Sequence, residues 1–118
     1  MDQILRRACL AVLASFCLAG FAHAQDAAPL RMVVPYPPGG PTDIVARAVT
    51  SAFAEELGRS VLIENRAGAS GMIGAAAVAK AAPDGNTLLI NPSIHVILPS
   101  LVPKMAYDAV RDLSLIHI

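Results

Sequence analysis

Two short glycine-rich stretches contain the residues of this sequence that are best suited to chemistry. Residues 35–41 read P-Y-P-P-G-G-P, and residues 65–74 read N-R-A-G-A-S-G-M-I-G. Glycine lets a backbone approach a ligand closely, and free amides at the start of a helix favour an anion. The prolines stiffen the first stretch, so its amides are held in place at little entropic cost. Both stretches predict anion binding by backbone amides, although a tight strand-to-helix turn without a ligand explains the second equally well.

Three side chains near the first stretch could add to such a site. Tyr36 could form a wall of the pocket, and Thr42 could offer a hydroxyl group. Asp43 would repel an anion, or it would accept a hydrogen bond from an amino or hydroxyl group of the ligand. Ordinary packing of Tyr36 and capping of a helix N-terminus by Asp43 are the simpler alternatives.

The second stretch also raises the alternative of an enzyme with Ser70 as its nucleophile. Gly68 to Gly71 resembles the hydrolase elbow G-x-S-x-G, but Met72 stands where that motif has glycine. A Ser-His-Asp triad would need His95 and an aspartate, and nothing in the sequence orients them. His95 has no metal-ligand partner at a suitable spacing, and the glycine spacing differs from the nucleotide-binding motifs. We predict no catalytic residue, metal or cofactor, and a periplasmic α/β enzyme using Ser70 remains the alternative.

Five alternating elements position these stretches. Residues 30–34 form a short β-rich run that predicts a buried strand, and residues 42–57 show helical periodicity before Gly58. A second strand is predicted from 61 to 63 or 65, a second helix over 72–82, and a third strand over 87–90. This order predicts an α/β fold, β-α-β-α-β, with a mostly parallel sheet. Ligands bind such sheets at the carboxyl ends of the strands, where both glycine-rich stretches lie.

Two further predictions concern the first helix and the end of the chain. Residues 91–105 predict irregular structure or a short helix, and residues 113–118 could begin a strand. In the first helix, Arg47, Ser51 and Glu55 are predicted to face away from the core. Its predicted inward face consists of apolar residues at helical spacing: Ile44, Val45, Ala48, Val49, Ala52, Phe53 and Leu57.

The first 24 residues have the pattern of a cleavable secretory signal peptide. Arg6 and Arg7 precede an uncharged, mostly apolar run over residues 8–21, and small residues at 22 and 24 mark a cleavage site. A membrane anchor is the alternative, but 14 helical residues rise only about 21 Å. Both cysteines lie in this segment, so the mature chain is predicted to have no disulfide. The paired arginines leave the twin-Arg export route open.

The charge of the chain argues against binding to nucleic acid. Nine basic residues balance nine acidic ones over the 118 residues. After residue 24, seven basic residues face eight acidic ones, without a long block of either sign. A nucleic-acid binder needs a basic surface that releases counterions.

Four segments closely resemble the Bug family, the periplasmic substrate-binding proteins of tripartite tricarboxylate transporters. They are V-V-P-Y-P-P-G-G-P-T-D-I-V-A-R (33–47), E-N-R-A-G-A-S-G-M-I-G-A (64–75), A-K-A-A-P-D-G-N-T-L-L (79–89) and P-S-L-V-P-K-M-A-Y-D-A-V-R-D-L (99–113). The sequence departs from the family at Leu98, where Asn is usual, and at residues 91–94, where a Gly- or Ser-rich tract is usual.

The resemblance implies a type II periplasmic-binding-protein-like fold with two lobes that close on a ligand. Residues 25–118 would then be the N-terminal portion of lobe one, with the second lobe missing. It also implies a periplasmic monomer that binds a small organic carboxylate and delivers it to the membrane subunits of the transporter. Carried over by position, the implied ligand-binding residues are Tyr36, Pro38, Gly39, Thr42 and Asp43, together with Gly68, Ala69, Ser70 and Gly71.

Overall fold

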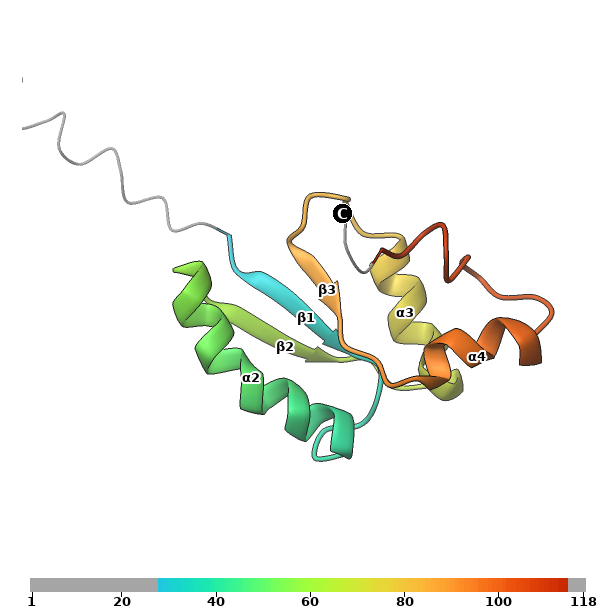
Figure 1. Ribbon diagram of the computed structural model, residues 1–118, viewed down its shortest axis with the longest axis horizontal. Helices are drawn as coiled ribbons and strands as arrows, with labels where there is room; N and C mark the ends of the chain where they lie inside the picture. Colours follow the sequence, from blue (N-terminus) through green and yellow to red (C-terminus); the bar gives the residue numbers. More distant parts are fainter. Residues whose placement is uncertain (1–27, 115–118) are drawn as a thin grey trace, which may run out of the picture.

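The computed structural model describes residues 28–114, which form three strands and four helical segments (Figure 1). The predicted signal peptide (1–24) and residues 115–118 of the predicted last strand lie outside this range. In chain order the elements are β1 (Leu30–Val34), α2 (Pro41–Leu57), β2 (Val61–Asn65), the 3-10 turn η2 (Ala69–Gly71), α3 (Met72–Ala79), β3 (Thr87–Leu89) and α4 (Ile94–Leu101).

The three strands form one parallel sheet in the order β2-β1-β3. Leu30 of β1 pairs with Val61 of β2, and Met32 pairs with Leu88 of β3. The first crossover runs outward from β1 to β2, and the second runs back past β1 to β3. Right-handed crossovers in opposite directions place their helices on opposite faces of the sheet. Figure 1 shows α2 and α3 on the two sides of the sheet, which confirms the predicted parallel β-α-β-α-β arrangement.

The central strand β1 carries the core. Leu30, Met32 and Val34 are buried, and Ala46 of α2 packs against them. β1 lies between β2 and β3, and helices cover both of its faces. A strand that is buried in this way has a nearly continuous apolar sequence. The prediction of a buried strand over residues 30–34 is confirmed.

The helix α2 forms where the sequence predicts it, but it buries a different face. Gly58 ends the helix with a φ of 62°, and its amide donates to carbonyls of the last turn. The predicted inward residues Ile44, Val45 and Val49 are 60%, 55% and 44% exposed, so this part of the prediction is wrong. Only Phe53 of that set packs against the core cluster.

The inward face of α2 is instead set by a small residue and a polar one. Ala46 is fully buried and Asp43 is 2% exposed. Ala46 lets the helix approach the sheet closely, and Asp43 finds hydrogen-bonding partners beneath the helix. Both effects outweigh the apolar pattern of Ile44, Val45 and Val49 in deciding the rotation of the helix.

The second half of the described chain follows the predicted order with shorter elements. The helix α3 ends at Ala79 rather than residue 82, and β3 ends at Leu89 rather than residue 90. The short helix that was one alternative for residues 91–105 is present as α4. Leu113 and Ser114 form no strand, so the predicted last strand does not begin at residue 113.

Candidate functional site

Two loops lie side by side at the carboxyl edge of the sheet. The first loop (residues 35–40) joins β1 to α2, and the second loop (residues 66–71) joins β2 to α3 through η2. The amide of Arg66 donates to the carbonyl of Val34 at 2.8 Å, which continues the β1–β2 pairing up to this edge. The parallel register therefore brings the two glycine-rich stretches together, as the sequence predicts.

The first loop leads into α2, whose N-terminus has no side-chain cap among the described residues. Gly40 is the N-cap residue, and no side chain of the described residues caps the helix start. Pro41 has no amide hydrogen, so the amides of Thr42 and Asp43 are the first-turn donors without a partner inside the helix. Together with the positive end of the helix dipole, these two amides favour an anion.

The second loop holds a strained backbone just before α3. Ala69 and Ser70 have φ values of 47° and 55°, which non-glycine residues rarely adopt. Gly68 and Gly71 also have positive φ, and the Gly71 amide closes a turn onto the Gly68 carbonyl at 3.0 Å. Strained residues of this kind concentrate at ligand-binding sites, because surrounding structure must hold them in place.

Tyr36 extends from the first loop to the second. Its hydroxyl donates to the carbonyl of Ser70 at 3.5 Å, a long hydrogen bond. A Cβ atom at Gly71 would lie 3.1 Å from the same hydroxyl, so the glycine allows this close approach. Tyr36 therefore lies at the junction of the two loops, and its role as a wall of a pocket stays a prediction.

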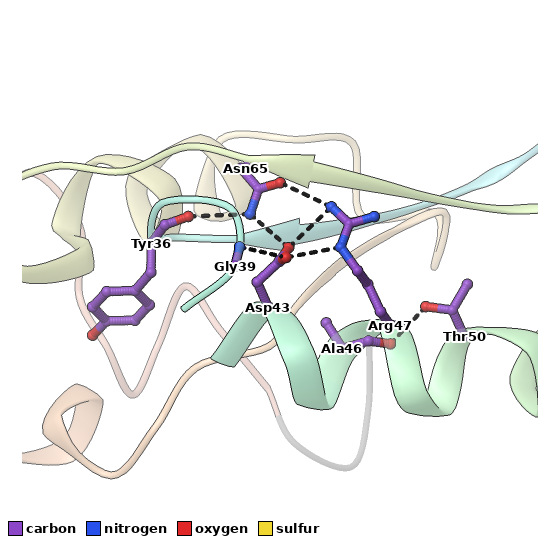
Figure 2. A network of polar contacts seen from close by, with 7 residues as sticks. All are labelled: Tyr36, Gly39, Asp43, Ala46, Arg47, Thr50 and Asn65. Carbon is purple, nitrogen blue, oxygen red and sulfur yellow. Dashed lines mark hydrogen bonds and ion pairs between the residues drawn. The ribbon is translucent and has the colours of Figure 1, made fainter. Parts of the chain in front are cut away.

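Beneath the loops, a buried carboxylate is the centre of a polar network (Figure 2). Asp43 accepts hydrogen bonds from the amide of Gly39 at 2.9 Å, from Nε of Arg47 at 2.8 Å and from Nδ2 of Asn65 at 2.9 Å. A second Arg47 nitrogen donates to Asp43 at 3.2 Å, and Asn65 also donates to the carbonyl of Tyr36 at 3.1 Å. The network joins the first loop, α2 and the end of β2.

The network keeps Asp43 ionised and cancels its charge locally. The hydrogen bond from Arg47 holds the pKa of the Asp43 carboxyl well below its usual range, and the bonds from Gly39 and Asn65 act in the same direction. The same contact raises the pKa of Arg47. An anion at the two loops would therefore meet a neutral ion pair rather than a bare carboxylate.

The predicted site residues lie at one edge of the sheet. Asp43 differs from the others because its side chain is buried in the polar network. Asp43 is not the N-cap that was its simpler alternative, because Gly40 occupies that position. The Gly39 amide is bonded to Asp43, so it is not a free donor toward solvent. The residues at the loops and the helix start are Tyr36, Pro38, Gly39, Thr42, Gly68, Ala69, Ser70 and Gly71.

Two residues of the network were missed by reasoning from the sequence. The sequence places Arg47 on the outer face of α2, and it places Asn65 at the possible end of a strand and the start of the second glycine-rich stretch, without a role for either side chain. The spacing of four residues between Asp43 and Arg47 is a recognisable signal for an ion pair on a helix. Nothing local signals the contact between Asp43 and Asn65, which lie 22 residues apart.

The third strand leads to a histidine that makes a different set of contacts. The ring of His95 stacks on Tyr107 with centroids 6.1 Å apart, and its Nδ1 lies 3.3 Å from Nδ2 of Asn91. His95 therefore faces an amide and a phenol rather than Ser70 and a carboxylate. This geometry does not favour the Ser-His-Asp alternative.

The part of the chain that the structure describes has neither a metal-ligand cluster nor a membrane-spanning helix. Within residues 28–114, no three His, Cys, Asp or Glu side chains gather closely enough to hold a metal ion. Over the same residues, no helix has the length and apolar character needed to cross a membrane.

Comparison with known proteins identifies the family of this chain. The sequence model of the protein family described as "Tripartite tricarboxylate transporter family receptor" matches residues 45–118. Protein BugT of Bordetella pertussis is 44% identical over 94 residues, which is 78% of this chain and 29% of BugT. This chain therefore spans about 30% of the length of the curated relatives it matches.

Solved structures agree with the sequence comparison. A periplasmic transporter is 40% identical with a TM-score of 0.66, over 76% of this chain and 30% of that one. MatC of Rhodopseudomonas palustris, solved with bound malate, is 43% identical with a TM-score of 0.65, over 71% of this chain and 29% of that one. The α/β fold described above is the first part of one lobe of such binding proteins. This chain belongs to the tripartite tricarboxylate transporter receptor family.

Proposed function

We propose that this chain forms part of an extracytoplasmic solute-binding protein that captures a small organic carboxylate for a tripartite tricarboxylate transporter. The observation that carries the proposal is the meeting of two strand-to-helix loops at one sheet edge, with the start of α2 uncapped by described side chains. Backbone amides at such an edge hold an anion without a basic patch. The malate bound in MatC is a ligand of this chemical class.

The ligand carboxylate would lie between the first turn of α2 and the second loop. The amides of Thr42 and Asp43 would be the donors on one side, and the backbone of Gly68 to Gly71 would line the other side. Tyr36 and Pro38 would form the wall, while Gly39 lets the first loop turn with a φ of 79°. The full proposed set of contacts is Tyr36, Pro38, Gly39, Thr42, Gly68, Ala69, Ser70 and Gly71, with Asp43 contributing its amide.

The remaining features of the proposal follow from the family. The protein acts as a binding protein without catalysis or a cofactor, as a monomer in the periplasm, and its partners are the membrane subunits of the transporter. Residues 1–24 serve as the signal peptide. Residues 25–118 belong to lobe one, and a second lobe would supply the other wall of the pocket.

Titration of the full chain with malate, followed by backbone amide NMR, tests the proposed function. Binding should shift the amides of Thr42, Asp43 and Gly71 progressively and saturably. The amides of Gly85 and Asn86 serve as the internal control, because they lie before β3 at the opposite edge of the sheet. Shifts of equal size at both edges, or none at either edge at tens of millimolar malate, would contradict the proposal.

A further inference from the structure

We propose that Asp43 is a positioning residue that sets the geometry of the two loops from beneath, and that its carboxylate does not contact the ligand. The inference rests on the proposed function, because it concerns how the same loops are held for an organic acid. It changes the role that the sequence assigns to Asp43, which was either a ligand contact or a simple helix cap.

The first argument is that the carboxylate has no acceptor capacity left. An ionised carboxylate offers about four lone-pair positions. One oxygen accepts from the Gly39 amide and from Nε of Arg47, and the other accepts from Asn65 and from a second Arg47 nitrogen. The Asp43 side chain is only 3% exposed, so a hydroxyl or amino group of a ligand cannot reach it without breaking these bonds.

The second argument is that the four bonds lead to the parts of the site that must be held together. Gly39 belongs to the first loop, Arg47 lies one turn along α2, and Asn65 is the last residue of β2, directly before the second loop. Asn65 also holds the Tyr36 carbonyl, so the first loop is fastened at two points. Figure 2 shows the carboxylate enclosed between these groups, with the Tyr36 ring turned away from it.

The third argument concerns charge. Arg47 pairs with Asp43 through two nitrogens, and its charge therefore neutralises the Asp43 carboxylate rather than that of a ligand. The pair leaves the amides of the α2 start as the source of positive potential at the first loop. A carboxylate ligand then gains from the helix start without facing an uncompensated aspartate.

The test compares Asp43→Asn with Asp84→Asn in the full chain. Asp84 is a matched control, since it also accepts a backbone amide, from Asn86 at 2.9 Å, but at the turn before β3. Without any ligand, hydrogen exchange of the Gly39 amide should become at least about tenfold faster in Asp43→Asn and stay unchanged in Asp84→Asn. Unchanged exchange at Gly39 in Asp43→Asn would overturn the proposal whether or not any acid binds.

Ligand titrations then separate positioning from contact. Malate and succinate differ by one hydroxyl group, so a residue that contacts this group discriminates between them. Asp43→Asn should weaken both acids by the same factor, about tenfold, at a temperature where each variant is fully folded. A loss confined to malate would show that Asp43 contacts the ligand, and unchanged affinity for both would show that it positions nothing.

A second variant, Asn65→Ala, keeps the proposal testable if Asp43→Asn does not fold. Asn65→Ala keeps the Asp43–Arg47 pair but removes the ties to the end of β2 and to the Tyr36 carbonyl. It should weaken both acids equally while leaving Gly39 exchange slow. Full affinity in Asn65→Ala would overturn the proposal. If wild type itself binds neither acid while Gly39 responds as expected, the proposed function fails and the role of Asp43 in holding the loops stands.

Discussion

At the scale of single residues, the site depends on groups that make close contacts rather than on exposed charge. The network around Asp43 is buried and its charges are paired, whereas the predicted ligand donors are uncharged amides. Glu64 of β2 is likewise paired, and hydrogen bonds from Arg31 and Arg66 lower the pKa of its carboxyl. The charged side chains of this region are therefore paired with one another.

The lowered carboxyl pKa values predict a loss of stability in acid. The pKa of Asp43 is lowered by Arg47, Gly39 and Asn65, and that of Glu64 by Arg31 and Arg66. In the unfolded chain such groups titrate near pH 4. The unfolded state therefore binds protons first as the pH falls, so this stability is complete above about pH 5 and declines below about pH 4.

Urea unfolding followed by circular dichroism between pH 6 and 2 checks this expectation. The free energy of unfolding should fall toward low pH in the wild type and fall less steeply in Asp43→Asn, which has no carboxyl to protonate at this position. Parallel curves for the two proteins would contradict a lowered pKa at Asp43.

One glycine of the second stretch is required by packing rather than by a turn. A Cβ atom at Gly74 would lie 2.7 Å from Cβ of Pro35 and 2.9 Å from its Cα. Gly74→Ala should therefore destabilise the fold by about 1–3 kcal/mol, as overpacking does. Gly40→Ala is the control, because its Cβ would meet only the Pro37 carbonyl at 3.3 Å. Equal unfolding midpoints in urea for both variants would refute the packing role of Gly74.

At the scale of elements, α2 combines two faces of unexpected character. Its inner face presents Asp43 and the small Ala46 to the sheet, while Ile44, Val45 and Val49 are exposed on this structure. A helix that is apolar on several sides is usually covered on several sides in a complete protein. The chain spans about 30% of the length of its relatives. In these longer proteins, we expect other parts of the chain to cover the outer face of α2.

A pair of leucine substitutions tests the observed rotation of α2. Ala46 is fully buried against β1, whereas Ala48 is exposed on the other side. Ala46→Leu should lower the free energy of unfolding by about 1–3 kcal/mol, because the added methyl groups have no space. Ala48→Leu should change it by less than about 0.5 kcal/mol. The reverse order in a urea titration would restore the face predicted from the sequence.

At the scale of the whole molecule, we expect residues 28–114 to provide one wall of the proposed binding site. Both loops and the start of α2 lie along a single sheet edge. Ligand pockets normally bury most of the surface of a small ligand. A single wall provides only part of that burial.

We therefore expect the 118-residue chain to bind malate weakly, with a Kd of about 1 mM or higher, which corresponds to roughly 4 kcal/mol of binding free energy. The amide NMR titration proposed above measures this constant directly. A chimera that adds the remaining 71% of MatC to this chain should bind malate much more tightly, because we expect the added part to supply the other wall of the pocket. A micromolar Kd for the 118-residue chain alone would contradict this expectation.

The order of the elements could be predicted because its signals are local. The run at residues 30–34, the glycine at 58 and the helical periodicity between them each act over a few residues. The adjacency of the two loops follows, since a parallel sheet places the carboxyl ends of its strands at one edge. The orientation of α2 could not be predicted, because apolar periodicity does not reveal that Asp43 has partners beneath the helix.

The sequence by itself determined the α/β architecture and the positions of the two loops. Only the tertiary structure decided the role of Asp43 and the buried face of α2. The physical reason is that both depend on contacts across the fold. The bond from Asn65 to Asp43 spans 22 residues, and no pattern within either segment specifies it. A buried charge is stable only with such partners, so the fold had to be seen before the residue could be understood.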